Sequence, residues 1–294
     1  MAEHTGIGWC DHTANFWWGC LKLSPACDHC YALALSKRTG HDIWGPPKTT
    51  ARREIQSTWK ELLKWDRKAE EDGVRRRVFV NSMSDFFEDH PQVEPLRNAA
   101  FPLLESLENL DALLLTKRIE NVERMVPAAW MHGNWPDHVW MGTSVENQEY
   151  ADLRILKLLP IPAKIRWLSL EPMLGPIDWR WSLCNCPWPA DAFRTRHLLS
   201  CPLSFYGDRR GPEEWPIHWV VVGGESGPGC RPMQIDWMRA IRDQCQDAGV
   251  PFFAKQLGGF PDKRDQLEDL PADLCIREWP ASATHVADMR DGVM

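Results

Sequence analysis

Short apolar runs that end in polar residues recur along the middle of the chain. Six of them are rich in β-branched or aromatic residues, and they lie at 78–80, 112–115, 139–141, 165–168, 219–222 and 252–254. Stretches with apolar residues at helical spacing lie between them. Strands that alternate with helices in this way are typical of βαβ units and a parallel sheet.

Helices are predicted at 93–107, 150–159 and 235–248, the last of which is closed by Gly249. With a first strand near 16–18 and a last strand near 274–276, the pattern predicts an α/β fold, a full or partial (β/α) TIM-type barrel. An open doubly wound sheet is the alternative. No glycine-rich dinucleotide fingerprint follows the first strand, which favours the barrel.

The strand ends are polar or charged, and this pattern predicts where the chemistry lies. In (β/α) barrels the carboxyl ends of the strands meet at one rim and carry the active site. Here the predicted strand ends supply charged side chains to that rim: Asp85, Lys117, Arg118, Glu146, Glu171, Glu225 and Lys255. We therefore expect a functional rim.

Composition places limits on the class of protein. The 294 residues suffice for one barrel domain over 1–280, followed by a polar tail at 281–294. No apolar run reaches the ~20 residues that span a bilayer, and the first residues lack a signal-peptide pattern, so we expect a cytoplasmic protein. The net charge of −7 argues against coating nucleic acid through bulk charge. Residues 37–77 nevertheless carry twelve Lys or Arg against seven Asp or Glu.

Three of the ten cysteines lie close together near the N-terminus, in a loop at 19–31 that is predicted to follow the first strand. Cys20, Cys27 and Cys30 have the spacing C-x6-C-x2-C. Three thiolates can hold three irons of a four-iron cluster and leave the fourth iron open. A structural zinc would want a fourth protein ligand, for which His29, Cys10 and His12 are the candidates.

A second group of soft ligands lies in an insertion at 179–215, between the predicted strands five and six. Its members are Cys184, Cys186, His197 and Cys201, with His218 as a substitute for His197. Such a set suits a small structural zinc site. Unpaired thiols in an irregular loop are the alternative.

The cysteine triplet and the barrel pattern resemble the radical S-adenosylmethionine (SAM) superfamily, although the usual spacing there is C-x3-C-x2-C. The segments 19–31, 80–85, 115–118, 142–147, 170–172 and 223–227 resemble a phage-associated three-cysteine-motif family of undefined role. That family is related to radical SAM enzymes and distantly to spore photoproduct lyase.

The resemblance implies a [4Fe-4S] cluster on Cys20, Cys27 and Cys30, with SAM bound at its open iron. The side chains that would bind SAM follow from residue type and place on the rim. Ser82, Ser84 and Asp85 suit its amine, Lys117 or Arg118 its carboxylate, and Thr143, Ser144, Glu146 and Asn147 its ribose; Thr116, Glu171 and Glu225 complete the cofactor-binding set. Cys230 could donate a hydrogen atom to a substrate radical.

Two functions therefore stand as hypotheses. The first is a radical SAM-type enzyme that modifies or repairs a nucleic acid or nucleoside-like substrate, with an electron donor such as flavodoxin or ferredoxin. The second is a non-redox zinc-binding protein that recognises nucleic acid or a protein partner. Metal content distinguishes the two.

Overall fold

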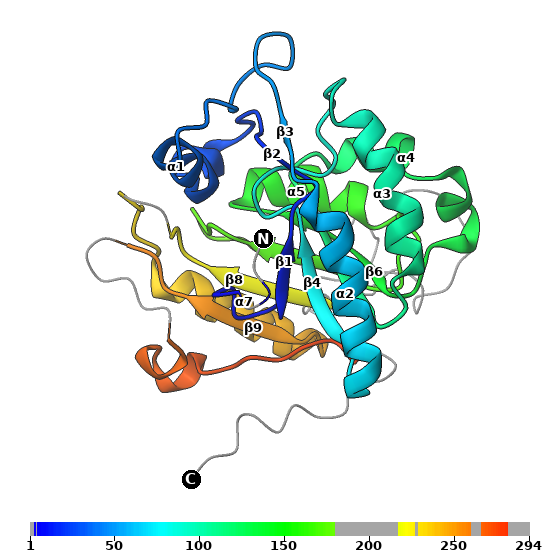
Figure 1. The fold of residues 1–294 in the computed structure, drawn as a ribbon. Helices are drawn as coiled ribbons and strands as arrows, with labels where there is room; N and C mark the ends of the chain where they lie inside the picture. The colour runs from blue at the N-terminus through cyan, green and yellow to red at the C-terminus, as the bar shows by residue number, and fades with distance from the viewer. Residues whose placement is uncertain (1–2, 4, 180–216, 227–228, 260–265, 282–294) are drawn as a thin grey trace.

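Seven parallel strands form the main sheet, and their order across the sheet follows their order along the chain (Figure 1). This computed structural model describes residues 3, 5–179, 217–226, 229–259 and 266–281. The strands are β1 (His12–Ala14), β4 (Arg76–Val80), β5 (Leu110–Thr116), β6 (Val139–Ser144), β7 (Arg166–Leu170), β8 (Trp219–Gly223) and β9 (Phe252–Gln256). A separate antiparallel pair joins β2 (Trp17–Trp18) to β3 (Arg53–Glu54).

The helices that connect the strands are α1 (Tyr31–Arg38), α2 (Ser57–Asp72), α3 (Glu94–Ser106), α4 (Val122–Met125), α5 (Gln148–Leu158) and α7 (Ile235–Ala248). All six predicted apolar runs form strands, and the three predicted helices are present. In α2, Leu62, Trp65 and Ala69 recur at helical spacing and are buried against the sheet. Gly249 ends α7 in a left-handed conformation, with φ 68°.

The sheet is curled but open, so the partial barrel is confirmed and the full barrel is wrong. Among the described residues, no strand pairs β9 with β1. The predicted last strand is absent because Leu274 closes a short 3-10 helix, Ala272–Leu274. The chain then runs antiparallel along β9, where the Ala254 N–H donates to the Ile276 carbonyl at 2.9 Å and the Glu278 N–H donates to the Phe252 carbonyl at 3.0 Å.

The predicted first strand is also misplaced. The first parallel strand is β1, which pairs with β4 up to Ala14 and Val80. Trp17 and Trp18 lie beyond it in the small antiparallel sheet, because the chain leaves the main sheet at Asn15, whose side chain accepts a hydrogen bond from the Met83 N–H at 2.6 Å. The cysteine loop still follows, and it therefore lies over the carboxyl end of the sheet.

The two faces of the sheet carry different side chains because successive residues in a strand point to opposite faces. The face toward the helices is aliphatic and belongs to the main core. The concave face holds a second buried cluster that is rich in tryptophan: Trp9, Phe79, Leu113, Trp140, Trp167, Trp219 and Phe253. We call this cluster the aromatic floor. No helix in the described part of the chain is long and apolar enough to cross a membrane.

Candidate functional site

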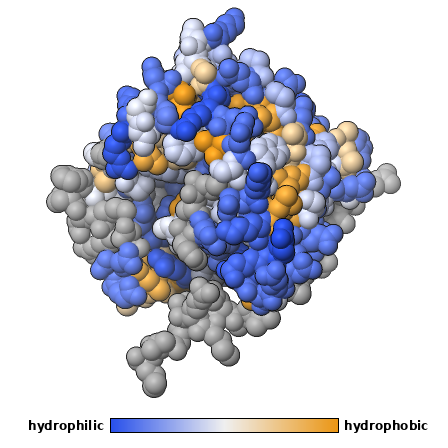
Figure 2. Space-filling view, viewed as in Figure 1, coloured by the Kyte–Doolittle hydropathy of each residue, from blue (hydrophilic) through white to orange (hydrophobic). Residues whose placement is uncertain are grey.

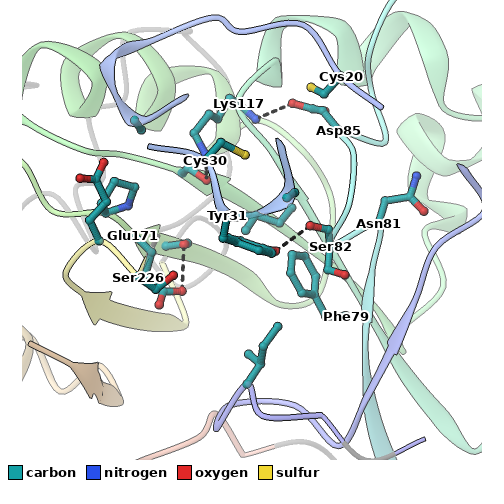
Figure 3. A pocket seen from close by; sticks show the side chains of 18 of the residues that line it. Cys20, Cys30, Tyr31, Phe79, Asn81, Ser82, Asp85, Lys117, Glu171 and Ser226 are labelled. Atoms are coloured by element: carbon teal, nitrogen blue, oxygen red, sulfur yellow. Dashed lines mark hydrogen bonds between the residues drawn. The ribbon is translucent and has the colours of Figure 1, made fainter. Parts of the chain in front are cut away.

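A cavity of about 340 Å³ lies above the aromatic floor, at the carboxyl ends of the strands (Figure 3). Eleven residues predicted as site residues line it: Cys20, Cys30, Ser82, Ser84, Asp85, Thr116, Lys117, Arg118, Ser144, Glu171 and Glu225. They come from segments that are far apart in the sequence. The polar rim expected from the strand ends is therefore a real cavity wall.

Strand periodicity explains which side chains reach the cavity. On β6, Trp140 belongs to the aromatic floor, and Ser144, four residues on, lines the cavity. On β7, Trp167 belongs to the floor, and Ser169 and Glu171 follow at steps of two. The concave face thus changes from aromatic to polar along β6 and β7.

Three of the residues predicted for the ribose site, Thr143, Glu146 and Asn147, do not line the cavity. Thr143 has the opposite parity to Ser144, and its hydroxyl donates to the Thr116 carbonyl at 2.8 Å. Glu146 is buried and paired with Arg154 at 2.7 Å. The side chain of Asn147 caps α5 by accepting from the Tyr150 N–H at 3.2 Å. All three stabilise the fold instead.

The cysteine loop lies across the cavity. Cys20 and Cys30 line it, and Cys27 closes the short 3-10 turn Pro25–Cys27; all three are half-buried. Three thiols within one loop suit an iron–sulfur cluster in number and type. In this conformation they do not converge: no three His, Cys, Asp or Glu side chains in the described residues are grouped to hold a metal ion.

Arg118 holds the loop at the Cys20 end. Its guanidinium donates to the Leu21 carbonyl at 2.8 Å and to the Cys20 Sγ at 3.7 Å. Burial raises the pKa of the Cys20 thiol to about 12, although the Arg118 charge acts in the opposite direction. Arg118 therefore lines the cavity but uses its guanidinium to position the first cysteine.

Asp85 holds Arg118 in turn. Its carboxylate accepts from the Arg118 guanidinium at 2.9 Å, the Thr116 hydroxyl at 2.6 Å and the Lys117 N–H at 3.0 Å. Burial alone would raise the pKa of Asp85, but Arg118 and these hydrogen bonds outweigh it and hold the pKa below its usual value. Asp85 and Arg118 thus pair with each other. The neighbouring Lys117 has no carboxylate partner among the described residues, so its charge is available to a ligand.

Arg231 holds the other end of the loop. Its guanidinium donates to the Pro25 carbonyl at 2.7 Å and to Glu225, which also accepts from the Arg231 N–H at 2.8 Å. Glu225 is almost fully buried and follows β8. Two arginines, each paired with a carboxylate beyond a strand end, therefore fix the cysteine loop at opposite sides of the cavity.

Replacing Arg231 with alanine is expected to loosen the loop without unfolding the protein. It removes a charge-assisted contact and leaves Glu225 buried without its cation, a change of about 1–3 kcal/mol in local stability. We expect maleimide to alkylate Cys27 about tenfold faster, as measured by mass spectrometry of peptides. Arg231→Lys should restore part of the protection, and Arg239→Ala, which removes an exposed partner of Asp273, should change nothing. Equal rates of Cys27 alkylation in the wild type and the three variants would contradict the role of Arg231 in holding the cysteine loop.

Two lysines reach the cavity in different electrostatic states. The Lys117 ammonium donates to the Ser144 hydroxyl at 3.3 Å, and no ion pair joins it to a described carboxylate. Lys255 pairs with Glu171 at 2.7 Å, and Glu171 also accepts from the Trp9 indole at 3.1 Å. The Lys117 ammonium therefore suits an anionic group of a ligand. The Lys255–Glu171 pair carries almost no net charge.

Several cavity residues were missed by the sequence patterns. Tyr31 extends into the cavity (Figure 3), where its hydroxyl donates to the Ser82 carbonyl at 2.6 Å. Trp9, Trp44 and Phe79 also contribute to the wall. The position of Tyr31 directly after Cys30 was an available signal. Trp9 and Trp44 enter from irregular segments, which no periodicity identifies.

Of the three candidate fourth zinc ligands, His29 lines the cavity with Cys20 and Cys30, whereas Cys10 and His12 do not. His12 stacks on Trp65 of α2, with ring centroids 4.6 Å apart, and Cys10 is buried against the aromatic floor.

Cys230 is buried but does not line the cavity, and its hydrogen-donor role stays a prediction. The insertion with Cys184, Cys186, His197 and Cys201 lies outside the described residues.

His218 lies at the amino end of β8, away from the cavity, where its Nδ1 accepts from the Arg166 N–H at 3.1 Å. Burial and the Arg166 charge lower the pKa of His218 to about 4. The folded state therefore disfavours protonation of His218. The stabilisation from neutral His218 is complete above pH 6.5, the usual value, and is lost as the pH falls toward 4.

His218→Asn keeps an acceptor for the Arg166 N–H but does not titrate. We expect this variant to lose part of the decline in unfolding free energy between pH 6.5 and 4, as measured by urea denaturation. Identical pH profiles for the variant and the wild type would contradict the shifted pKa.

The fold and the site define an α/β half-barrel protein with a three-cysteine loop across the cavity at the carboxyl ends of its strands. Residues 4–288 match the family described as "Protein of unknown function (DUF5131)", and the chain belongs to that family. Among curated proteins, none matches this sequence. The family description names no source, so the phage association stays a prediction.

Solved structures of spore photoproduct lyase are similar at low identity. A double mutant "with bound AdoMet and dinucleoside spore photoproduct" is 11% identical over 80% of this chain, with a TM-score of 0.42. A cysteine-to-serine mutant is 10% identical over 85% of this chain, also with a TM-score of 0.42. The matches cover 61% and 65% of those chains, less than two thirds of their length. A likeness at this level assigns no ligand or reaction to this chain.

Proposed function

We propose that this protein is a radical SAM-type enzyme that acts on a nucleic acid or nucleoside-like substrate. One observation carries the proposal: the three-cysteine loop spans a cavity at the carboxyl ends of parallel strands. That cavity presents several hydroxyls and Lys117, a cation with no carboxylate partner in the described part of the chain. Cys20, Cys27 and Cys30 would hold a [4Fe-4S] cluster. When bound, the cluster would supply the electron for reductive cleavage of SAM.

Other residues of the chain would bind SAM or hold the cysteine loop in position. Lys117 and Ser144 suit the carboxylate and hydroxyls of SAM, whereas Asp85 and Arg118 hold the loop in place. The aromatic floor closes the cavity from below. A one-electron donor such as flavodoxin or ferredoxin completes the scheme. Zinc at the insertion stays a separate proposal.

The metal content of wild-type protein purified without oxygen tests the proposal. We expect iron and sulfide, brown colour and cleavage of SAM after addition of a chemical reductant. Zinc without iron at the three cysteines would contradict the proposal and support the non-redox alternative, a zinc protein that recognises nucleic acid or a partner.

A further inference from the structure

A basic surface lies beside the cysteine loop, on the last turn of α1 and on the segment that joins α1 to α2. We call residues 37–54 the basic segment. Lys37, Arg38, Lys48 and Arg53 are exposed, and no ion pair among the described residues joins any of them to a carboxylate. The exposed carboxylates of the segment are Asp42 and Glu54. The basic segment thus exposes four cations and two carboxylates, in a chain whose net charge is −7.

The basic segment is rigidly built. Buried Arg52 makes two hydrogen bonds of 2.8 Å to Glu88, which neutralises its charge. The same guanidinium donates to carbonyls within the segment, at Ile43 (3.2 Å) and Gly45 (2.8 Å). Lys48 and Arg53 are therefore carried on a preorganised loop, and Lys37 and Arg38 lie in the last turn of α1. This order lowers the conformational cost of binding a partner.

Aromatic rings lie among these cations. The Arg53 guanidinium lies 5.7 Å from the centre of the half-buried Trp18 ring and hydrogen-bonds to His41. The Trp18 and His41 rings are 6.1 Å apart. Interleaved cations and aromatic rings suit a single-stranded nucleic acid, whose unpaired bases offer faces for stacking; an acidic peptide has no such faces.

The basic segment is joined directly to the site. The Gly45 N–H donates to the Cys20 carbonyl at 3.1 Å, and Trp44 lines the cavity. Gly19, with φ +108°, allows the close approach, because a side-chain carbon there would lie 2.4 Å from the Ile43 carbonyl. In Figure 1 this segment and α1 form the upper part of the molecule, where Figure 2 shows many hydrophilic residues.

From these observations we infer that the basic segment is the docking surface for the phosphate backbone of a single-stranded nucleic acid. Lys37, Arg38, Lys48 and Arg53 bind successive phosphates, and one nucleotide reaches the cavity past Trp44. The inference rests on the proposed function for the role of the cavity. Binding itself needs neither a cluster nor SAM, so the two can fail separately.

Fluorescence anisotropy with a labelled sixteen-nucleotide oligothymidylate tests the surface on the full chain. Four phosphate contacts at about 0.7 each predict a slope of log affinity against log salt between about −2 and −3. The variant Lys37→Gln/Arg38→Gln/Lys48→Gln/Arg53→Gln should bind at least tenfold more weakly, with a slope near zero. The matched control, Lys60→Gln/Lys64→Gln/Arg67→Gln/Lys68→Gln, removes as many cations from α2 and should bind like the wild type.

Three results would overturn the inference: no salt-dependent binding by the wild type, equal losses in the two quadruple variants, or equal competition by polyglutamate of the same charge. The last result would identify an acidic protein as the partner. Loss of iron uptake together with retained oligonucleotide binding would refute the proposed function alone.

Discussion

Replacing Cys20, Cys27 and Cys30 together with alanine is expected to abolish iron and sulfide uptake. The wild type should take up about four irons and four sulfides per chain under anaerobic reconstitution, because in the proposed function the three thiolates hold a four-iron cluster. Each single replacement should lower the content strongly, since two remaining thiolates hold a cluster poorly. Iron, sulfide and visible absorption are measured on the same samples.

A matched control separates ligation from the mere number of thiols. Cys275 is exposed and hydrogen-bonds to the Leu267 carbonyl at 3.2 Å, away from the cavity lining. Cys275→Ala should therefore reconstitute like the wild type. Full iron content in the triple variant would refute the cluster at this loop, and circular dichroism should show that all variants are folded.

Replacing Lys117 with methionine is expected to weaken SAM binding by about 10- to 100-fold. Lys117 is the cavity cation without a carboxylate partner among the described residues, and a hydrogen bond to a charged group contributes about 1.5–3 kcal/mol. Methionine keeps most of the length of the side chain and removes the charge. Calorimetric titration of reconstituted protein with SAM measures the change.

Lys157→Met serves as the control, because it removes one charge from the exposed face of α5. Its SAM affinity and its iron content should equal those of the wild type. Unchanged SAM affinity in Lys117→Met would show that the anion is bound elsewhere. A parallel loss of iron in that variant would assign Lys117 to the loop instead of the ligand.

Periodicity in the sequence predicted the parallel strands and the location of the site. Apolar runs that end in polar residues identified all six later strands, because a parallel sheet is buried on both faces. The same periodicity could have distinguished Ser144 from Thr143, since Ser144 has the parity of Trp140. Counting in steps of two from the tryptophans gives Ser169 and Glu171 as well.

The partners of the site residues and the open edge of the sheet could not be predicted, because they depend on contacts between segments that are distant in the sequence. Arg118 and Asp85 were predicted as SAM ligands by residue type, but each is the principal partner of the other. Trp9 hydrogen-bonds to Glu171, which lies 162 residues further along the chain. The missing eighth strand follows from a short 3-10 helix that ends at Leu274. No local pattern encodes such pairings.

The aromatic floor constrains the order in which parts of the protein can fold. Trp9 packs on three other rings of the floor, Phe79, Trp167 and Trp219. The Trp279 indole donates to the Trp9 carbonyl at 3.4 Å across 270 residues of sequence. Contacts between such distant residues form late, since they require closure of a long loop. During synthesis, Trp9 can therefore make this contact only after Trp279 has left the ribosome. The aromatic floor, which underlies the cavity, reaches its final packing only after that point.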